Sequence, residues 1–505
     1  MGHRAELQRN FSMMAMLGLA FAILNSWTAL SASLSLSITS GGSTSVIWGC
    51  VTAGVCTLCV AVSLAEFLSA YPTAGGQYHW VAVSWKSWRP ILSWITGWVN
   101  CAGWVALVAT NCLLSSQLIL GVISLVHPNY ESKNWHQFFI YIAFTIISFI
   151  VNAFMNSILP PIMKGAFIWS IAGFAVVSIA VLACKAQGYN SAYLVFCQFI
   201  NETGWPDGIA WLLGLLQGSL GLTAFDAVAH MIEEIPNAAK EGPKIMVSCI
   251  GIGTFTGTIF LMILLFVAGD LGPVTSSAAG PLLQILKNAT SNNAGAICLL
   301  MVPLVCLLMA TISVMTTSSR MLFAFARDGG LPFSRVFSKV HTGLGLPLNS
   351  LYLTSALVII FGCIFLGSSR LMKESAFNAI ISASVVALNV SYGMPIAVRC
   401  LRGRDVLPER PWKIHPIAGW VADIIGLSYI ILTTVLFLFP PTLPVDGSSM
   451  NYCVVAFGII VIISAVQWII DGRKNFTGPR IDVTLEGTTE YTPENVTHTG
   501  GKGLD

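Results

Sequence analysis

Long runs of apolar residues recur along the entire chain, and most charged residues lie in the short segments between them. A run of about twenty apolar residues is long enough to cross the hydrocarbon core of a bilayer as a helix. With 55% hydrophobic and only 9% charged residues among 505, the chain cannot be a soluble domain of this size. It is predicted to be an all-α integral membrane protein with twelve transmembrane helices, near residues 11–38, 45–70, 90–126, 136–158, 164–186, 207–235, 244–269, 294–324, 347–367, 374–396, 416–439 and 450–471.

The distribution of Lys and Arg predicts how these spans are oriented. With a cytoplasmic N-terminus, all but five of the 25 basic residues fall on the cytoplasmic side, the exceptions being Lys133, Lys185, Lys287, Arg370 and Lys373. Both termini are therefore expected in the cytoplasm. The first apolar run is too long for a signal peptide and lacks a small-residue cleavage site. The expected domains are a cytoplasmic N-terminus (1–10), a twelve-helix membrane domain (11–471) and a polar, disordered cytoplasmic tail (472–505).

Two sequons fall in segments expected outside the cell, so Asn201 and Asn288 are the predicted glycosylation sites. Two further sequons, at Asn475 and Asn495, fall in the cytoplasmic tail and should remain unmodified. The thirteen cysteines lie mostly within spans and show no metal-ligand spacing. No metal and no cofactor are expected, and a net charge of +3 from basic residues in loops gives no indication of a nucleic-acid partner.

The predicted span 207–235 carries an acidic residue where a spanning helix would lie deepest in the bilayer. Asp226 follows Gly218, Gly221 and Thr223. A carboxylate near the bilayer centre costs at least ~2.5–3.5 kcal/mol on insertion scales, which makes Asp226 a functional-site hypothesis. The glycines favour a helix that breaks beside a cavity. A broken helix with an acid at its break is how many secondary transporters build a site near the midplane of the membrane.

The first predicted span, 11–38, is interrupted in a similar way. Asn25, Ser26, Trp27 and Thr28 stand in the middle of apolar residues and are followed by a serine-rich face. Two interrupted helices, the first and the sixth, occupy corresponding places in two five-helix halves, which indicates an inverted-repeat transporter. For the serines, the alternative that small residues simply let helices pack closely stays open.

Charged residues gather where several spans reach the predicted cytoplasmic surface. The candidates for an inner gate made of ion pairs are Glu66, Glu233, Glu234, Arg320 and Arg327. The two arginines also fit simple anchoring at the lipid headgroups, the more common role of basic residues there. Trp98 and Trp104 lie deeper in the third span and are candidates for an aromatic wall that binds a cation.

Together these motifs resemble those of the amino acid–polyamine–organocation superfamily, and within it the fungal amino acid/choline transporter family, which includes choline and 4-aminobutyrate permeases. The resemblance rests on residues 25–27 (NSW), 69–80 (SAYPTAGGQYHW), 224–234 (AFDAVAHMIEE) and 325–332 (FARDGGLP), and it extends over most of the membrane domain. It implies a five-plus-five inverted repeat with two extra helices, and a substrate held by the unwound parts of spans one and six. By position, the implied substrate contacts are Asn25, Ser26, Trp27, Thr28, Leu220, Thr223, Ala224, Phe225 and Asp226.

One feature departs from this pattern. Bacterial proton-coupled relatives carry a titrating lysine in the middle of the fifth span, whereas Lys164 lies at the inner end of that span here and the middle reads Ile168-Trp169-Ser170-Ile171. Coupling through a lysine is therefore in doubt. Asp226 becomes the candidate residue for proton coupling.

These observations predict a secondary active permease of the plasma membrane that moves an amino acid or a related small amine, such as choline or 4-aminobutyrate, and is driven by protons. Asp226 can serve either by attracting an ammonium group or by carrying the proton. The chain has no Walker motif, which excludes ATP-driven transport, and only His230 among eight scattered histidines shares a helix face with an acid, so an enzyme is not expected. The alternatives are a transporter of another small metabolite, in export or inside the cell, and a nutrient sensor in the same fold. The expected partners are the solute, protons and the lipid bilayer.

Overall fold

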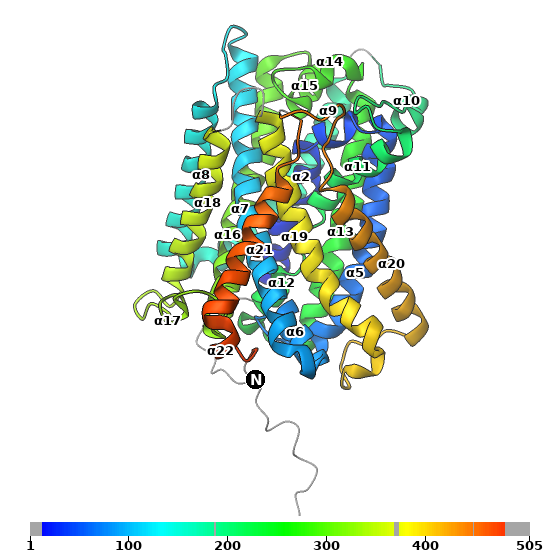
Figure 1. Ribbon diagram of the computed structural model, residues 1–505. Coiled ribbons are helices and arrows are strands. Elements are labelled where there is room, and N and C mark those ends of the chain that lie inside the picture. The colour runs from blue at the N-terminus through cyan, green and yellow to red at the C-terminus, as the bar shows by residue number, and fades with distance from the viewer. Residues whose placement is uncertain (1–12, 186–187, 368–372, 448, 480–505) are drawn as a thin grey trace, which may run out of the picture.

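The computed structural model describes residues 13–185, 188–367, 373–447 and 449–479. This part of the chain is helical and contains isolated bridges but no strand. The long helices stand side by side along a common direction (Figure 1). The expectations for residues 1–10 and for the tail beyond residue 479 lie outside the described residues.

The first half of the bundle begins with a helix in three pieces and continues with long helices joined by short ones. Its elements are α1 (Met13–Leu24), α2 (Ser26–Ala32), α3 (Ser35–Ile38), α4 (Gly42–Thr44), η1 (Ser45–Gly49), α5 (Cys50–Ala70), α6 (Gln77–Ser84), η2 (Lys86–Trp88), α7 (Arg89–Val126), α8 (Asn134–Phe154), η3 (Asn156–Ile158), α9 (Leu159–Cys184) and α10 (Ala192–Cys197).

The second half also begins with a divided helix. Its elements are α11 (Asp207–Gly221), α12 (Ala227–His230), η4 (Ile232–Glu234), α13 (Ala238–Val267), α14 (Leu271–Thr275), α15 (Pro281–Thr290), α16 (Asn293–Arg327), α17 (Ser334–Phe337), α18 (Leu348–Gly367), α19 (Lys373–Arg402), η6 (Arg404–Val406), α20 (Pro416–Leu436), α21 (Cys453–Gln467), η7 (Trp468–Gly472) and α22 (Arg473–Asn475).

Ten helical segments of the described part are long and apolar enough to cross a membrane. They correspond to ten of the twelve predicted spans. The first and the sixth predicted spans are the two that are broken: α1 and α2 meet at Asn25, and α11 and α12 are separated by residues 222–226. The hydropathy pattern therefore predicted the helices well, and the two interruptions fall where polar residues enter the apolar runs.

Small residues allow the longest helices to approach one another closely, because lipid offers no hydrophobic drive for helix association. α19 and α16 pack along α7, and α13 packs along α5. A Cβ atom added to Gly54 of α5 would lie 2.3 Å from the side chain of Thr254 in α13, and one added to Gly103 of α7 would lie 2.8 Å from Leu388 in α19. These glycines set the distances between the helices that surround both breaks.

The bundle has two distinct ends. We call the end with α6, α17 and α22, at the bottom of Figure 1, the basic end, because α16 and α19 finish there with Arg327 and Arg402. The other end carries α10, α14 and α15. Residues 472–479, the described part of the predicted tail, lie at the basic end, where Phe476 is buried with its ring 5.2 Å from that of Trp94.

Candidate functional site

The break in the first span is centred on Asn25, which adopts a left-handed conformation with φ 39°. Asn is one of the few residues that visits this region readily. The carbonyl oxygen of Asn25 starts the next helix by accepting from the backbone N–H of Ala29 at 2.9 Å. The side-chain nitrogen of Asn25 and the hydroxyl of Ser26 are buried and have no hydrogen-bond partner among the described residues. Buried polar groups without partners are uncommon, and each calls for an explanation such as a ligand.

Trp27 and Thr28 are engaged within the protein. The indole Nε1 of Trp27 donates to the hydroxyl of Ser170 in α9 at 2.9 Å. Its ring packs edge to face against Phe260 at 4.9 Å and Phe174 at 6.1 Å, and it is fully buried. The hydroxyl of Thr28 donates to the carbonyl of Asn25 at 2.9 Å. Of the four predicted contacts on the first span, Asn25 and Ser26 thus retain free polar groups, whereas Trp27 lies in an aromatic cluster.

The break in the sixth span begins directly after Gly221, but the unusual backbone conformation belongs to Ala224, with φ 74°. Gly218 and Gly221 instead provide room for packing: a Cβ atom on Gly221 would lie 2.5 Å from Leu30 of α2, and one on Gly218 would lie 2.8 Å from Ala53 of α5. The glycines were expected to loosen the helix. Their structural role is to bring α11 against α2 and α5, immediately before the helix ends.

The predicted contacts of the sixth span, Leu220, Thr223, Ala224, Phe225 and Asp226, are all buried. The Phe225 ring lies 4.8 Å from the ring of Tyr392 in α19. The Tyr392 hydroxyl accepts from the backbone N–H of Ala224 at 3.2 Å and donates to Oδ1 of Asp226 at 2.6 Å. Tyr392 therefore joins the reversed backbone of the break to the acid.

Asp226 receives contacts from four surrounding side chains. Besides Tyr392 on Oδ1, its Oδ2 accepts from Nε2 of Gln77 at 2.8 Å and from Nε1 of Trp104 at 3.3 Å, and it lies 3.1 Å from Nε2 of His230. These groups come from α6, α7, α12 and α19. Charge-assisted hydrogen bonds are what make a buried carboxylate tolerable, so the structure provides Asp226 with a complete polar shell.

Sequence reasoning missed two of these partners. Gln77 begins α6 immediately after Gly75 and Gly76, and Asn100 in α7 donates to its Oε1 at 3.0 Å. Tyr392 is a lone hydroxyl-bearing aromatic in an apolar helix, which was the one available signal for it. Trp104 was expected in a cation-binding wall and contacts the acid instead, whereas Trp98 packs 6.0 Å from Trp94.

The predicted gate residues divide into two groups at the basic end. Arg320 pairs with Glu234 at 3.3 Å and Arg327 pairs with Glu233 at 2.9 Å. These ion pairs connect α16 with η4, directly beyond the second break. Glu66 is not part of this group, although it was a candidate partner for the same arginines.

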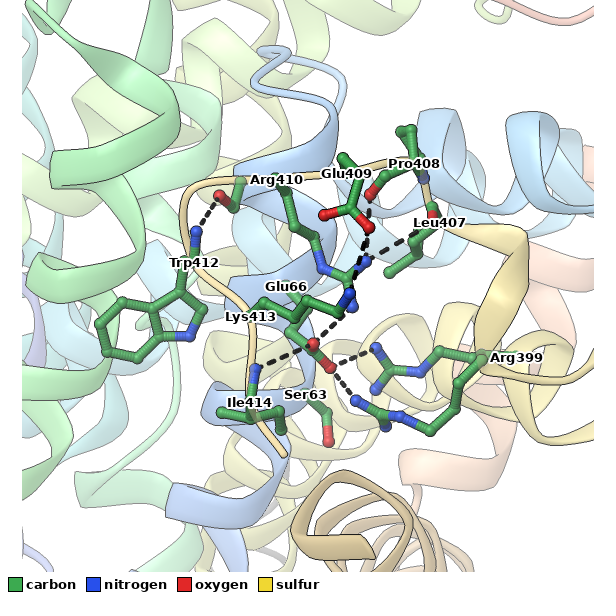
Figure 2. A network of polar contacts seen from close by, with 12 residues as sticks. Ser63, Glu66, Arg399, Leu407, Pro408, Glu409, Arg410, Trp412, Lys413 and Ile414 are labelled. Atoms are coloured by element: carbon green, nitrogen blue, oxygen red, sulfur yellow. Dashed lines mark hydrogen bonds and ion pairs between the residues drawn. The ribbon is translucent and has the colours of Figure 1, made fainter. Parts of the chain in front are cut away.

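Glu66 lies in a separate buried cluster with three arginines (Figure 2). Its Oε2 accepts from Nη1 of Arg399 at 3.2 Å and from Arg404, and its Oε1 accepts from Nη2 of Arg410 at 2.5 Å. The backbone N–H of Ile414 adds a further bond at 3.3 Å, and Asp423 of α20 pairs with both Arg399 and Arg404. The cluster attaches the segment between α19 and α20 to α5.

A cavity of about 900 Å³ lies at the other end of the bundle. Its wall includes Ser35 and Leu36 of α3, Leu213 and Leu216 of α11, and the segment 272–281. Among the described residues that line the cavity, none is one of the nine predicted substrate contacts. Leu216 lies one helical turn before Leu220, so the cavity ends close to the breaks.

Neither predicted glycosylation site presents a free side chain. Asn201 donates through Nδ2 to the carbonyl of Trp205 at 2.7 Å and to Asp207 at 2.9 Å. Asn288 donates to the carbonyl of Ala268 at 2.7 Å. Both amides are used to hold loops near the α15 end of the bundle. Glycosylation of these residues stays a prediction.

The family model for amino acid permeases matches residues 11–464. The chain belongs to the amino acid permease family. This places it in the amino acid–polyamine–organocation superfamily, as predicted, and makes it an integral membrane protein of a transporter family rather than an enzyme.

Several relatives match this permease over nearly their whole length. A Macrophomina phaseolina protein classed provisionally as an amino acid/polyamine transporter is 36% identical over 86% of this chain and 96% of its own. The choline transporter of Saccharomyces cerevisiae is 32% identical over 93% of this chain and 83% of its own. An amino-acid permease of Arabidopsis thaliana, BAT1, is 29% identical, with 95% of each chain covered.

Proposed function

We propose that this protein is a proton-coupled secondary permease of the plasma membrane for an amino acid or a related small amine such as choline or 4-aminobutyrate. Its twelve spans form a five-plus-five inverted repeat with two extra helices, in which α1–α2 and α11–α12 are the broken first and sixth spans. The observation that carries the proposal is the buried Asp226 with its polar shell, directly beside a break of the backbone. Discontinuous helices near the midplane are the usual site of substrate and ion binding in such transporters.

The basic end faces the cytoplasm in this proposal, in accordance with the positive-inside rule. Both termini then lie in the cytoplasm, and the 900 Å³ cavity faces outward. Glu202 is the charged side chain among the described residues that line the cavity. A carboxylate in an otherwise uncharged vestibule attracts solutes that carry an ammonium group.

The solute binds between the two breaks, beneath the cavity. Asn25 and Ser26 supply the side-chain contacts of the first break, because their polar groups are buried and unpartnered in the described structure. Asp226 is the proton-coupling residue rather than the partner of the solute's ammonium. The reason is that its oxygens are already occupied by Tyr392, Gln77 and Trp104.

The ion pairs Arg320–Glu234 and Arg327–Glu233 act as the inner gate. They lie just beyond the second break on the cytoplasmic side, and they must separate when the path opens inward. Glu66 holds the neighbouring loop and contributes to the gate only through that structure.

The experiment is uptake into proteoliposomes of choline, 4-aminobutyrate, spermidine and the common amino acids, with and without a protonophore. The wild-type protein is expected to concentrate at least one of these solutes, and the protonophore is expected to abolish the accumulation. Asp226→Asn should lose accumulation while solute exchange across the membrane persists. The matched control is Asp207→Asn, the same change at an acid near the start of α11.

Two results would contradict the proposal. In the first, the wild-type protein concentrates none of these solutes. In the second, accumulation is insensitive to the protonophore or equally strong with Asp226→Asn.

A further inference from the structure

We propose that Asp226 shares the coupling proton with His230. While this proton is bound, the contact between His230 and the backbone carbonyl of Ala74 keeps the cytoplasmic side of the protein closed, and loss of the proton weakens that contact. The proposal rests on the proposed function, since it names the proton site of that transport cycle. Its basis is the geometry of one imidazole ring that is held at both nitrogens.

The two contacts of His230 determine how many protons the pair carries. Nδ1 lies 3.0 Å from the carbonyl oxygen of Ala74, and a carbonyl only accepts, so Nδ1 must hold a proton. Nε2 lies 3.1 Å from Oδ2 of Asp226, and this contact requires one further proton between the two atoms. With that shared proton the pair is electrically neutral overall. Without it the pair carries one negative charge.

The neighbours of Asp226 indicate on which side the shared proton resides. Gln77 Nε2 and Trp104 Nε1 both donate to Oδ2, and the Tyr392 hydroxyl donates to Oδ1. A carboxylate oxygen that already accepts two hydrogen bonds favours a third donor over a proton of its own. The proton therefore belongs to His230, and the pair is an imidazolium facing a carboxylate.

Loss of the proton breaks a contact whichever way the ring responds. If Nδ1 keeps its proton, two lone pairs face each other across the 3.1 Å between Nε2 and Oδ2. If the proton moves to Nε2, a lone pair on Nδ1 faces the Ala74 carbonyl instead. The ring has little freedom to turn, because it is buried and Trp104 packs edge to face against it at 5.6 Å.

The contact with the Asp226 carboxylate joins two residues four apart at α12 itself, and as a charge-assisted bond it is the stronger of the two, so the remaining proton moves to Nε2. The contact that is lost is then the one between α12 and the turn 71–76 that precedes α6, on the cytoplasmic side under the proposed function. Deprotonation therefore favours separation of α12 from the turn, which is the direction of inward opening. The proton leaves to cytoplasmic water as the contact separates, and the next outward-facing state regains it. No bond other than N–H or O–H is made or broken.

When the Asp226–His230 pair loses its proton, the surrounding ionisable groups do not replace the lost positive charge. Glu233 and Glu234 are paired with Arg327 and Arg320. Four further titratable side chains on the elements packed around the pair are engaged elsewhere or shared with it: His79 with Thr73, Tyr78 with Asp328, Cys249 with the Met246 carbonyl, and Tyr392 with Asp226 itself.

The test compares His230→Gln with wild type in proteoliposomes, using whichever compound of the solute panel the wild type concentrates. An imposed gradient of about one pH unit supports about tenfold accumulation for one coupled proton. His230→Gln is expected to bring this accumulation ratio close to one. Its rate of solute exchange is expected to fall by a smaller factor. The matched control is His79→Gln, a buried histidine of α6 that should retain the wild-type ratio.

A second measurement needs no solute, and its main readout comes from the wild-type protein, so it remains informative if a variant does not fold. Solid-state ¹⁵N NMR of histidine-labelled wild type should show one imidazole with both nitrogens protonated, and Asp226→Asn should abolish that signal. A His230→Gln protein that accumulates solute as well as wild type, or the absence of a doubly protonated imidazole, would overturn the inference. A wild type that exchanges solute but is unaffected by the pH gradient would overturn the proposed proton coupling itself, a result visible before any variant is made.

Discussion

The cluster around Glu66 gives a prediction whose size follows from the contacts. In Glu66→Gln, one carboxylate oxygen is replaced by an amide NH₂ group. Whether this group takes the place of Oε1 or of Oε2, it faces an arginine donor. Two acceptor contacts are lost, either those from Arg399 and Arg404 or those from Arg410 and Ile414. Hydrogen bonds to charged groups are worth about 1.5–3 kcal/mol each. Removing one partner of a buried ion pair costs about 3–5 kcal/mol, which agrees with that sum.

The side chain of Glu66 is fully buried, so solvent does not compensate for the loss. Asp423 would still pair with Arg399 and Arg404, but Arg410 would face a neutral side chain. A loss of this size is a large part of the stability of a typical protein, about 5–15 kcal/mol. The variant is therefore expected to melt well below wild type when detergent-solubilised protein is heated and the remaining monomer is measured by fluorescence-detected size-exclusion chromatography.

A double variant separates charge balance from packing. Arg410 pairs with Glu66 and otherwise donates to the carbonyls of Leu407 and Pro408. Glu66→Gln combined with Arg410→Gln restores the net charge of the cluster, and coupled residues of this kind deviate from additivity by about 0.5–3 kcal/mol. The loss in melting temperature of the double variant should be smaller than the sum of the losses of the two single variants. The control is Glu409→Gln, on the same loop, whose pairing with Lys413 is exposed and should not affect melting (Figure 2).

The reasoning would be refuted by a Glu66→Gln protein that melts like wild type, or by strictly additive effects of the two substitutions.

Two further predictions follow from single contacts. Trp27→Ala should reduce the amount of folded protein, because truncation of a buried Trp costs about 3–5 kcal/mol. Trp27→Phe loses only the bond to Ser170 and should retain the wild-type uptake per folded molecule. A well-folded Trp27→Ala protein with weakened solute binding would instead show that Trp27 recognises the solute. Glycosidase treatment should increase the gel mobility of the protein by removing sugar from Asn288 and not from Asn201, whose two amide hydrogens are both engaged. Loss of this mobility shift in Asn201→Gln would contradict the prediction.

The interruptions of the helices were predictable because their cause is local. Asn25 is a polar residue that tolerates left-handed backbone, placed within an apolar run, and Asp226 is too costly in a continuous lipid-facing helix. The position of the reversed backbone was not predictable in the same way. Ala224 takes the positive φ, while the nearby Gly218 and Gly221 are used for packing. A non-glycine residue in that conformation is held there by tertiary contacts, here the bond from its N–H to Tyr392.

The partners of the charged residues could not be predicted, because they come from helices far apart in the chain. Glu66 binds Arg410 from a loop 344 residues later, and Asp226 binds Gln77 from a helix 149 residues earlier. Hydropathy and charge predict that such residues need partners, but the choice depends on how the helices pack. The same limit explains Trp27. Its neighbours in sequence predict a role in binding, which stays a prediction, whereas its packing against Phe174 and Phe260 depends on how the bundle is assembled.

The position of Tyr392 explains how a solute and a proton can be linked without sharing a contact. Its hydroxyl touches both the open backbone of the break, through the Ala224 N–H at 3.2 Å, and the acid, at 2.6 Å. Under the proposed function, a solute carboxylate or hydroxyl that takes over the Ala224 N–H removes the donor from Tyr392 and changes the strength of its bond to Asp226. An ammonium group placed directly on Asp226 would instead have to displace Gln77 or Trp104 and leave a buried donor unpaired, which is costly. These contacts therefore favour two neighbouring sites, one for the solute between the two breaks and one for the proton at Asp226, connected through a single hydroxyl.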